Sequence, residues 1–500
     1  MSLELITLLG GALSLLIVAI YRFFRQPYEF FQKRGVAGPK GSVLFGSWWG
    51  RWNKVQGEED LSLVKQFGPI FGEYAGRTPV LVATDPAVAR AVLLDNANHF
   101  RSRRANCVRD KFLHQGLLAL EARGAKDTPL LSKDAVRQVL PRILACTNEL
   151  SSSIKKLTEN AEGKVVISGI VSDFLVKVLV EAVLGYDETE KAIDVKQFSN
   201  YFSQAFVNDN PDSPLAAFPM IYPSLVPLDK FVLKPKAAKY FTSLLLCKVQ
   251  EKANAEKKDR QPDLMDLLLE LHQASKKKDS EEESKNEENV LETKEFVFVQ
   301  SLAVLLNASL TARSLTTMGT VMLGANPELQ ERLHAELYQK LEASDEFDLV
   351  HNSEYLDMFI SEVLRLYPVE FRLERECCET LELENAKIEK GMIVTIPTYA
   401  LHRQTQIYEE PEKFNPERFS RDNKEARDLF AFLPYGQAGN STANISIQWS
   451  VLVAKLAIAA LVKKFKFSPA EGAKLPPTFE PGVTGVPILQ PQTVVAESRK

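Results

Sequence analysis

The chain has 500 residues, of which 45% are hydrophobic and 25% are charged, an ordinary composition for a folded globular protein. Its formal net charge of −4 gives no reason to expect a nucleic-acid partner. Its five cysteines show no Cys-x-x-Cys spacing, which favours reduced thiols in a cytosol-facing body over a disulfide framework or a zinc site.

An uncharged apolar run, Leu5 to Tyr21, lies near the amino terminus. As a helix it would be about 25 Å long, close to the lower limit for crossing a bilayer. Only Glu4 precedes the run as a charged residue, whereas several basic residues follow it: Arg22, Arg25, Lys33 and Arg34. A cleaved signal peptide is the alternative, but it would carry its basic residues before the apolar run. The pattern therefore predicts an uncleaved membrane anchor over residues 1–24, with the body of the protein in the cytosol.

The next segment, Gly35 to Gly41, is rich in turn residues. It predicts a hinge within residues 25–45 that stops any helix and sets the angle of the body to the membrane. Residues 74–86 then suggest two short strands around a turn, followed by a helix that begins near Asp85 with Pro86 at its first position. A small sheet region is expected here, at the start of a body that covers residues 46–500.

Apolar residues recur at three- and four-residue spacing from Lys133 to Leu271, which predicts several amphipathic helices. A segment rich in Pro and Phe, Phe218 to Pro223, interrupts them. A membrane-dipping loop over a substrate entrance and an ordinary packed loop are both open for this segment. Residues 276–289 carry almost no apolar side chain and are predicted to form a charged, exposed loop.

A long apolar segment follows from Phe296 to Gly324. Its polar residues, Gln300, Asn307 and Arg313, favour a central buried helix over a second membrane span. Asn326 and Pro327 are expected to end this helix and start the next. The chain has no Walker-type loop and no Gly-x-Gly-x-x-Gly turn, so a nucleotide-binding fold is not expected.

The carboxy-terminal half contains three motifs at characteristic distances. Glu362 and Arg365 lie three residues apart in a helical run, where they can pair on one face. Arg418 follows in the sequence Pro-Glu-Arg-Phe, and the segment Phe-Leu-Pro-Tyr-Gly begins at Phe432. Together these motifs resemble the cytochrome P450 superfamily, and the chain is most similar to its microsomal branch, which contains drug-metabolising enzymes and thromboxane synthase. The resemblance covers essentially the whole chain.

The resemblance implies a mainly α fold with small β-sheets, in a single large domain after an N-terminal membrane helix. It also implies a single-pass protein of the endoplasmic reticulum membrane with haem iron as cofactor. Such a protein is an oxidoreductase, typically a monooxygenase, that acts on a lipophilic small molecule with electrons from a reductase. Residues at the positions of Glu362, Arg365 and Arg418 form a structural triad behind the haem in this family, and Arg375 matches a partner of a haem propionate.

The segment that begins at Phe432 departs from the family's haem-binding pattern, Phe-x-x-Gly-x-x-x-Arg-x-Cys-x-Gly. Aligned on Gly436, the position of the axial Cys falls on Thr442 and that of the Arg falls on Asn440. The last cysteine in the chain is Cys378, so no shift of register restores a thiolate. A Thr hydroxyl is a far weaker ligand, because it stays protonated at neutral pH.

The oxygen-side motif of the family, Ala-Gly-x-Asp/Glu-Thr, aligns with Asn307 to Thr311, and only Thr311 matches. Thr311 is a possible proton relay, although its hydroxyl can equally bond back into its own helix. Leu310 cannot relay a proton, and Ala308 adds a methyl group where the family has Gly. A Trp-x-x-x-Arg motif is expected near residues 120–135, but the tryptophans lie elsewhere: Trp48, Trp49, Trp52 and Trp449.

These substitutions predict a degenerate family member, a pseudoenzyme that keeps the fold but has lost haem-thiolate monooxygenase activity. It would survive as a lipophile-binding or interaction protein, or as a relic, and its binding of haem is in question. The alternative is an active haem-dependent monooxygenase with nonstandard iron ligation, supported by the triad, Arg375 and Thr311. A third possibility is weak haem carriage without oxygen chemistry. The histidines are all expected to be ordinary surface or core residues: His99, His114, His272, His334, His351 and His402.

Overall fold

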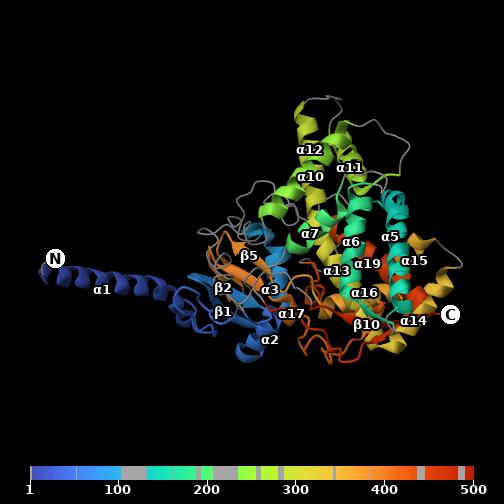
Figure 1. Ribbon diagram of the computed structural model, residues 1–500. Helices are drawn as coiled ribbons and strands as arrows, with labels where there is room; N and C mark the ends of the chain where they lie inside the picture. Colours follow the sequence, from blue (N-terminus) through green and yellow to red (C-terminus); the bar gives the residue numbers. More distant parts are fainter. Residues whose placement is uncertain are drawn as a thin grey trace.

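The computed structural model shows a helix-rich body with small β-sheets and one long helix that projects away from it (Figure 1). The structure describes residues 3–51, 53–102, 132–160, 163–186, 193–205, 235–254, 261–279, 287–341, 345–383, 386–435, 445–481 and 490–499. The predicted fold class, mainly α with small sheets, is confirmed.

The projecting helix, α1 (Leu3–Arg25), contains the apolar run near the amino terminus and extends it at both ends. Its large apolar side chains from Leu13 to Ile20 are between 46% and 73% exposed. At about 1.5 Å per residue the helix is roughly 35 Å long, enough to cross the hydrocarbon core of a bilayer. Two arginines, Arg22 and Arg25, lie in its last turn, next to the body.

A five-stranded sheet lies next to the end of α1, with the strand order β1-β2-β8-β5-β3. β1 (Ile70–Ala75) and β2 (Thr78–Ala83) form an antiparallel hairpin. The other strands are β3 (Phe100–Ser102), β5 (Leu373–Cys377) and β8 (Ile393–Ile396). After the hairpin, α3 (Pro86–Arg90) begins with Pro86 at its first position, and Asp85 Oδ1 accepts the N–H of Ala87 at 2.8 Å. The predicted strands, turn and helix start are therefore confirmed.

The connection between α1 and the sheet is packed against the β1–β2 hairpin. It contains two short 3-10 helices, η1 (Gln26–Glu29) and η2 (Gln32–Arg34). The ring of Phe31 is buried against Gly72, where any Cβ would lie 2.2 Å from a ring carbon of Phe31. The N–H of Gly72 donates to the carbonyl of Ala37 at 2.8 Å. The segment predicted as a hinge therefore packs against β1, and its role in setting the angle to the membrane stays a prediction.

The helical body is built on long helices that cover one another around a large apolar core. The helices expected between Lys133 and Leu271 are present, whereas the segment Phe218 to Pro223 lies outside the described residues. They are α5 (Lys133–Asn160), α6 (Ile167–Val178) with the π turn η5 (Leu179–Val183), α7 (Val195–Ala205), α10 (Pro235–Asn254) and α11 (Leu264–Asp279). Further along the chain come α14 (Pro327–Leu341), α15 (Glu346–His351), α16 (Glu354–Leu366), α17 (Thr398–Leu401), α18 (Arg421–Ala426) and α19 (Ile445–Lys464).

Two smaller sheets complete the described residues. One has the strand order β4-β10-β9 and brings the last strand, β10 (Thr493–Ser498), between β4 (Lys164–Val166) and β9 (Phe465–Pro469). The other pairs β6 (Leu381–Leu383) with β7 (Ala386–Ile388).

The central helix is interrupted by one π turn. The segment predicted as a single buried helix consists of α12 (Glu287–Ala303), the π turn η7 (Val304–Ala308) and α13 (Ser309–Ala325). The helix ends before Asn326 and α14 begins at Pro327, as predicted. α13 packs closely on α19, because a Cβ at Gly319 would lie 2.6 Å from the Cδ1 atom of Ile458. α19 is itself long and apolar enough to cross a membrane, but it is 67% buried inside the protein and serves as a core helix.

The segment predicted as a charged loop over residues 276–289 is helical at both of its described ends, which corrects the prediction there. α11 continues to Asp279 and α12 begins at Glu287, whereas residues 280–286 lie outside the described residues. The prediction followed from the lack of apolar side chains, which argues against burial but not against helix formation. Lys and Glu are good helix formers, so exposed helix ends can carry this composition.

A capping box starts α11. The N–H of Asp266 donates to Asp263 Oδ1 and the N–H of Asp263 donates to Asp266 Oδ2, both at 3.1 Å. The ammonium group of the buried Lys252 contacts both carboxylates. Burial raises the pKa of Asp263 despite the nearby Lys252, because two carboxylates share one cation.

Candidate functional site

Glu362 and Arg365 form a bidentate ion pair on α16. Arg365 Nε donates to Glu362 Oε2 at 2.7 Å, and Arg365 Nη2 donates to Glu362 Oε1 at 2.8 Å. Both side chains are 0% exposed. The spacing of three residues places them on one face of the helix, and burial of that face brings the pair into the core.

The remaining donors of Arg365 bind backbone carbonyls of the irregular segment after α17. Nη1 donates to the carbonyls of His402 at 2.9 Å and Pro411 at 2.7 Å, and Nη2 donates to that of Lys413 at 3.3 Å. A planar guanidinium carries five N–H donors in a fixed fork. Arg365 therefore ties residues 402–413 to α16 as well as neutralising Glu362.

Arg418 completes the set of three predicted charges. It lies in the 3-10 helix η8 (Pro416–Phe419), and its Nε atom is 3.5 Å from Glu362 Oε1. Its Nη2 atom donates to the carbonyl of Glu410 at 2.9 Å, while the N–H of Asn415 donates to Glu362 Oε1 at 2.7 Å. The structure thus brings Glu362, Arg365 and Arg418 together around one buried carboxylate.

His402 lies between this charge cluster and the segment that begins at Phe432. Its Nδ1 atom is 3.2 Å from the carbonyl oxygen of Arg365, and its Nε2 atom accepts the N–H of Leu433 at 3.0 Å. Burial lowers the pKa of His402 well below its usual value, and the positive charges of Arg365 and Arg403 lower it further. The ring is therefore neutral, and its Nδ1–H donates a hydrogen bond to the backbone carbonyl of Arg365. The expectation of an ordinary core residue missed this link, because a single His carries no signal in the sequence.

Phe432 is held in an aromatic cluster. Its ring centroid lies 4.7 Å from that of Phe419 and 5.2 Å from that of His402. The hydroxyl of Tyr408 donates to the carbonyl of Ala431 at 3.0 Å. These contacts set the path of the chain as far as Tyr435. The predicted positions Gly436, Asn440 and Thr442 lie outside the described residues.

Thr311 is buried near the start of α13, just after the π turn η7. A π turn inserts one extra residue into a helix and shifts the side chains that follow, and it often marks a functional site. Ala308 is the last residue of the turn and is buried, and Ser309 Oγ donates to the carbonyl of Leu305 at 2.5 Å. The irregular turn thus overlaps the start of the segment that aligns with the oxygen-side motif, at residues 307–308.

Arg375 lies on β5, where its side chain is partly buried. Its Nη1 atom donates to the carbonyl of Glu374 at 2.8 Å. In the sheet it is paired with Ser102 on β3 and Val394 on β8. The structure therefore places Arg375 in the five-stranded sheet, whereas Glu362 and Arg365 lie on α16.

A second buried charge cluster was not foreseen from the sequence. Arg372 Nε donates to Asp60 Oδ2 at 2.7 Å, and Arg372 Nη1 donates to Glu73 Oε1 at 2.6 Å. Arg51 contacts the same two carboxylates at 2.9 Å and 2.8 Å. Burial by itself would raise the pKa of Glu73, but Arg372 and Arg51 outweigh it and lower the pKa to about 2. The cluster connects α2 (Gln56–Phe67), β1 and the start of β5.

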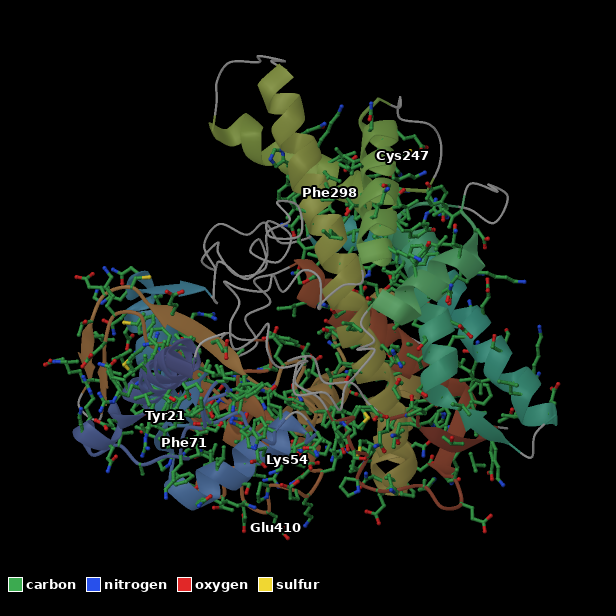
Figure 2. All side chains as sticks on the ribbon, turned by 60° about the vertical axis from the view of Figure 1, so that its left-hand side comes forward. Tyr21, Lys54, Phe71, Cys247, Phe298 and Glu410 are labelled. Atoms are coloured by element: carbon green, nitrogen blue, oxygen red, sulfur yellow. The ribbon has the colours of Figure 1, made fainter. Side chains whose placement is uncertain are left out.

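Four cysteines lie in the described residues, on different elements of the fold: Cys146, Cys247, Cys377 and Cys378. Cys146 is buried with its Sγ atom 3.5 Å from Glu181 Oε2, and Cys377 Sγ lies 3.0 Å from the carbonyl of Glu379. Cys247 is exposed on α10, at the opposite edge of the molecule from Glu410, the residue bound by Arg418 (Figure 2). Within the described ranges no group of His, Cys, Asp and Glu residues could hold a metal ion. His402 uses both ring nitrogens in the bonds given above, and Cys107 lies outside the described residues.

Comparison with known proteins identifies the family. The sequence profile of the cytochrome P450 family matches residues 37–495, so the chain belongs to this family. It is 28% identical over 486 residues to cytochrome P450 3A11 of Mus musculus and 27% identical over 480 residues to cytochrome P450 3A2 of Rattus norvegicus. Each match covers 93% of this chain and 92% of the relative. Cytochrome P450 3A56 of Fundulus heteroclitus is 27% identical over 497 residues, covering 96% of this chain and 95% of that protein.

Proposed function

We propose that this protein is a membrane-anchored member of the cytochrome P450 family that has lost haem-thiolate monooxygenase chemistry. The observation that carries the proposal is Thr442 at the position of the axial cysteine, in a chain whose last cysteine is Cys378. A haem iron supplies oxygen activation in this family when a thiolate ligates it, because the thiolate promotes cleavage of the O–O bond. Thr442 carries a neutral hydroxyl and has no comparable donor strength.

The fit of the site to haem supports the same proposal. The alignment places Asn440 where the family has an Arg that binds a propionate, and no Trp-x-x-x-Arg motif is present in the chain. Buried carboxylates without cationic partners cost several kcal/mol each. With the thiolate and two of three propionate partners gone, the residues do not fit a tightly held haem.

The residues on the oxygen side give independent support. Leu310 occupies the position of the acidic residue that relays protons, and its hydrocarbon side chain cannot do so. The residues that hold the fold, in contrast, are all present and joined by short hydrogen bonds, as around Glu362. A scaffold that is retained for another purpose would lose the residues needed for catalysis and keep those that hold the fold. We assign to this scaffold the role of binding a lipophilic ligand or a protein partner.

We place the protein in the endoplasmic reticulum membrane as a single-pass protein with a cytosolic body. Support comes from the length of α1, its exposed apolar side chains and the basic residues that follow it. Its projection from the body in Figure 1 is compatible with this orientation. An electron-donating reductase is a partner only if the protein is active.

An active monooxygenase with nonstandard iron ligation is the second candidate. It is favoured by the complete triad around Glu362, by Arg375 on β5 and by the buried Thr311 next to a π turn. Under this candidate Thr311 relays protons and Arg375 binds a propionate.

The two candidates differ in the spectrum of the protein expressed with haem supplied. We expect the purified wild-type chain to lack a carbon-monoxide band at about 450 nm after reduction, because this band reports a thiolate ligand. A band there in the wild-type protein would refute the proposal. Thr442→Cys should restore the band if the scaffold still accepts haem, whereas the matched control Ser441→Cys should not. Recovery of haem without turnover would assign the remaining defect to Leu310 and Ala308.

A further inference from the structure

The central helix α13 carries a cation without a counter-charge. Arg313 lies near the start of this helix and is partly buried, whereas most residues of α13 are fully buried. Burial lowers the pKa of Arg313, because no nearby carboxylate of the described residues offsets the loss of water. Within the described ranges its guanidinium forms no ion pair and no hydrogen bond. The positive charge is therefore partly removed from water without compensation.

Deeply buried arginines elsewhere in the fold have carboxylate partners. Arg365 binds Glu362 from a position three residues away on the same helix, and Arg372 binds Asp60. In α13 the residue three positions before Arg313 is an uncharged leucine. A guanidinium carries five N–H donors, and those of Arg313 find no acceptor in the part of the chain that the structure describes. An anion from outside the chain could use these donors.

Three residues next to Arg313 share its side of the helix. Leu310, Ser314 and Thr317 lie three before, one after and four after it, and about 100° per residue keeps all four within one side. Leu310 and Ser314 are partly exposed like Arg313, whereas Thr317 is 1% exposed. The hydroxyl oxygen of Thr317 is buried and has no hydrogen-bond partner among the described residues. An accessible strip therefore leads from Leu310 past a cation to a buried free hydroxyl.

This side of α13 differs from the side that carries Thr311. Thr311 and Arg313 are two residues apart, or about 200° around the helix axis, so they lie on nearly opposite sides. The neighbours of Arg313 on the helix belong to the large apolar core, among them Ala312, Leu315 and Met318. A ligand that reaches Arg313 in such surroundings needs an apolar body as well as an anionic group.

We propose that Arg313 and Thr317 bind the carboxylate of a lipophilic acid whose apolar part lies along Leu310. Arginine binds a carboxylate through two parallel N–H donors, and the hydroxyl of Thr317 adds a third donor one turn further on. One cation matches the single charge of a carboxylate, whereas a phosphate dianion would need a second cation. This site rests on ligand binding by the retained scaffold, as proposed above, and it defines the class of the ligand.

Binding of a matched pair of probes tests the carboxylate site. The full-length chain in nanodiscs is dialysed against labelled octanoate or labelled octanol, and the uptake by empty nanodiscs is subtracted. Arg313→Met removes the charge but keeps a long side chain. We expect it to weaken octanoate binding about tenfold more than octanol binding, because hydrogen bonds to charged groups are strong. The control is Arg332→Gln on α14, which should affect neither probe, since Arg332 is 54% exposed and pairs with Glu417.

Leu310→Glu should block the site from within the chain. The new carboxylate would lie three residues before Arg313, which is the spacing at which Glu362 pairs with Arg365. We therefore expect octanoate binding to fall as it does in Arg313→Met. The matched variant Leu310→Gln has the same size but no charge, so it should weaken octanoate binding less. Equal effects of the two substitutions would overturn the proposal, because bulk and not charge would then control binding.

Chemical modification locates the bound carboxylate. Phenylglyoxal reacts with guanidinium groups, and peptide mapping by mass spectrometry reports the rate of modification at each arginine. Octanoate should slow the modification of Arg313 several-fold, whereas octanol should not. The rate at Arg332 in the same sample should stay the same with either probe. Equal protection of Arg313 by acetate at the same concentration would refute a lipophilic ligand, since a small anion would then be enough.

Stability separates ligand binding from a role in folding. Removing an unpaired, partly buried charge relieves a desolvation cost, so the urea midpoint of Arg313→Met in detergent should stay the same or rise. A clear fall of this midpoint together with lost octanoate binding would overturn the proposal, because the arginine would then serve the fold. If both probes bind and neither depends on Arg313, only the carboxylate site is refuted. If neither probe binds, ligand binding by the scaffold is refuted as well.

Discussion

Replacing Glu362 by Gln would show how strongly the buried charges hold the carboxy-terminal half together. Glu362 accepts three hydrogen bonds, from Arg365 Nε, Arg365 Nη2 and the N–H of Asn415. The isosteric amide has one oxygen, so one Arg365 donor would face an NH2 group. Arg365, which is 0% exposed, would also lose its counter-charge while Arg418 stays 3.5 Å away. Removing one partner of a buried pair costs about 3–5 kcal/mol, and we expect a loss in this range.

Urea denaturation of the full-length chain in detergent measures this loss as a shift of the unfolding midpoint. The control is Glu425→Gln, which removes one side of an exposed pair with Arg421, the two side chains being 69% and 83% exposed. Exposed pairs contribute little, so the control should change stability by less than about 1 kcal/mol. A chain of this size can unfold through intermediates, so the unfolding should be followed by both fluorescence and circular dichroism. Both signals should rank the midpoints of wild type and the two variants in the same order. Equal shifts for the two variants would refute the reasoning.

Three further predictions concern pH. The pKa of Glu73 is lowered to about 2, so its ionised form should contribute about 3 kcal/mol to the free energy of unfolding above pH 4.5, and this contribution should be lost as pH falls toward 2. Glu73→Gln should reduce stability at pH 7. In a plot of the unfolding midpoint against pH, the variant should show a smaller decrease on the acid side. Because the pKa of His402 is lowered in the folded protein, the unfolded chain binds a proton at a higher pH than the folded chain does, and stability should fall below about pH 6.5. His402→Asn cannot titrate but keeps a donor to the carbonyl of Arg365, so it should remove this pH dependence. The same variant should cost about 1–3 kcal/mol at every pH, because the N–H of Leu433 loses its acceptor. The raised pKa of Asp263 makes its ionised form unfavourable at neutral pH, and Asp263→Asn removes this charge but retains the helix cap. The thermal unfolding midpoint of Asp263→Asn relative to that of wild type should therefore be higher at pH 7 than at pH 4. The opposite order would contradict the assignment.

The features that the sequence predicted well depend on residues close together in the chain. The hairpin at residues 70–83 and the start of α3 at Pro86 follow from local backbone preferences. The pair of Glu362 and Arg365 follows from helical spacing alone. The place of Arg418 came from the resemblance to the family, because no local rule connects it with α16.

The features that the sequence missed have causes that lie outside any short window. The π turn at Val304 to Ala308 has no sequence signature, and packing around the central helix determines where an extra residue is accommodated. The ends of α11 and α12 extend into a charged segment because helix propensity, and not burial, sets them. The loop position Thr442 was read from the sequence, and its place in space stays a prediction.

Membership of the cytochrome P450 family and the absence of a cysteine after Cys378 could be read directly from the residues. Local spacing and composition are enough for such conclusions, because they do not depend on distant contacts. The cluster that joins Arg372 to Asp60, 312 residues apart, and the neutral state of His402 required the folded structure. Both arise because the fold brings distant groups into a buried environment, where charges are stable only when paired and an imidazole next to two arginines stays unprotonated.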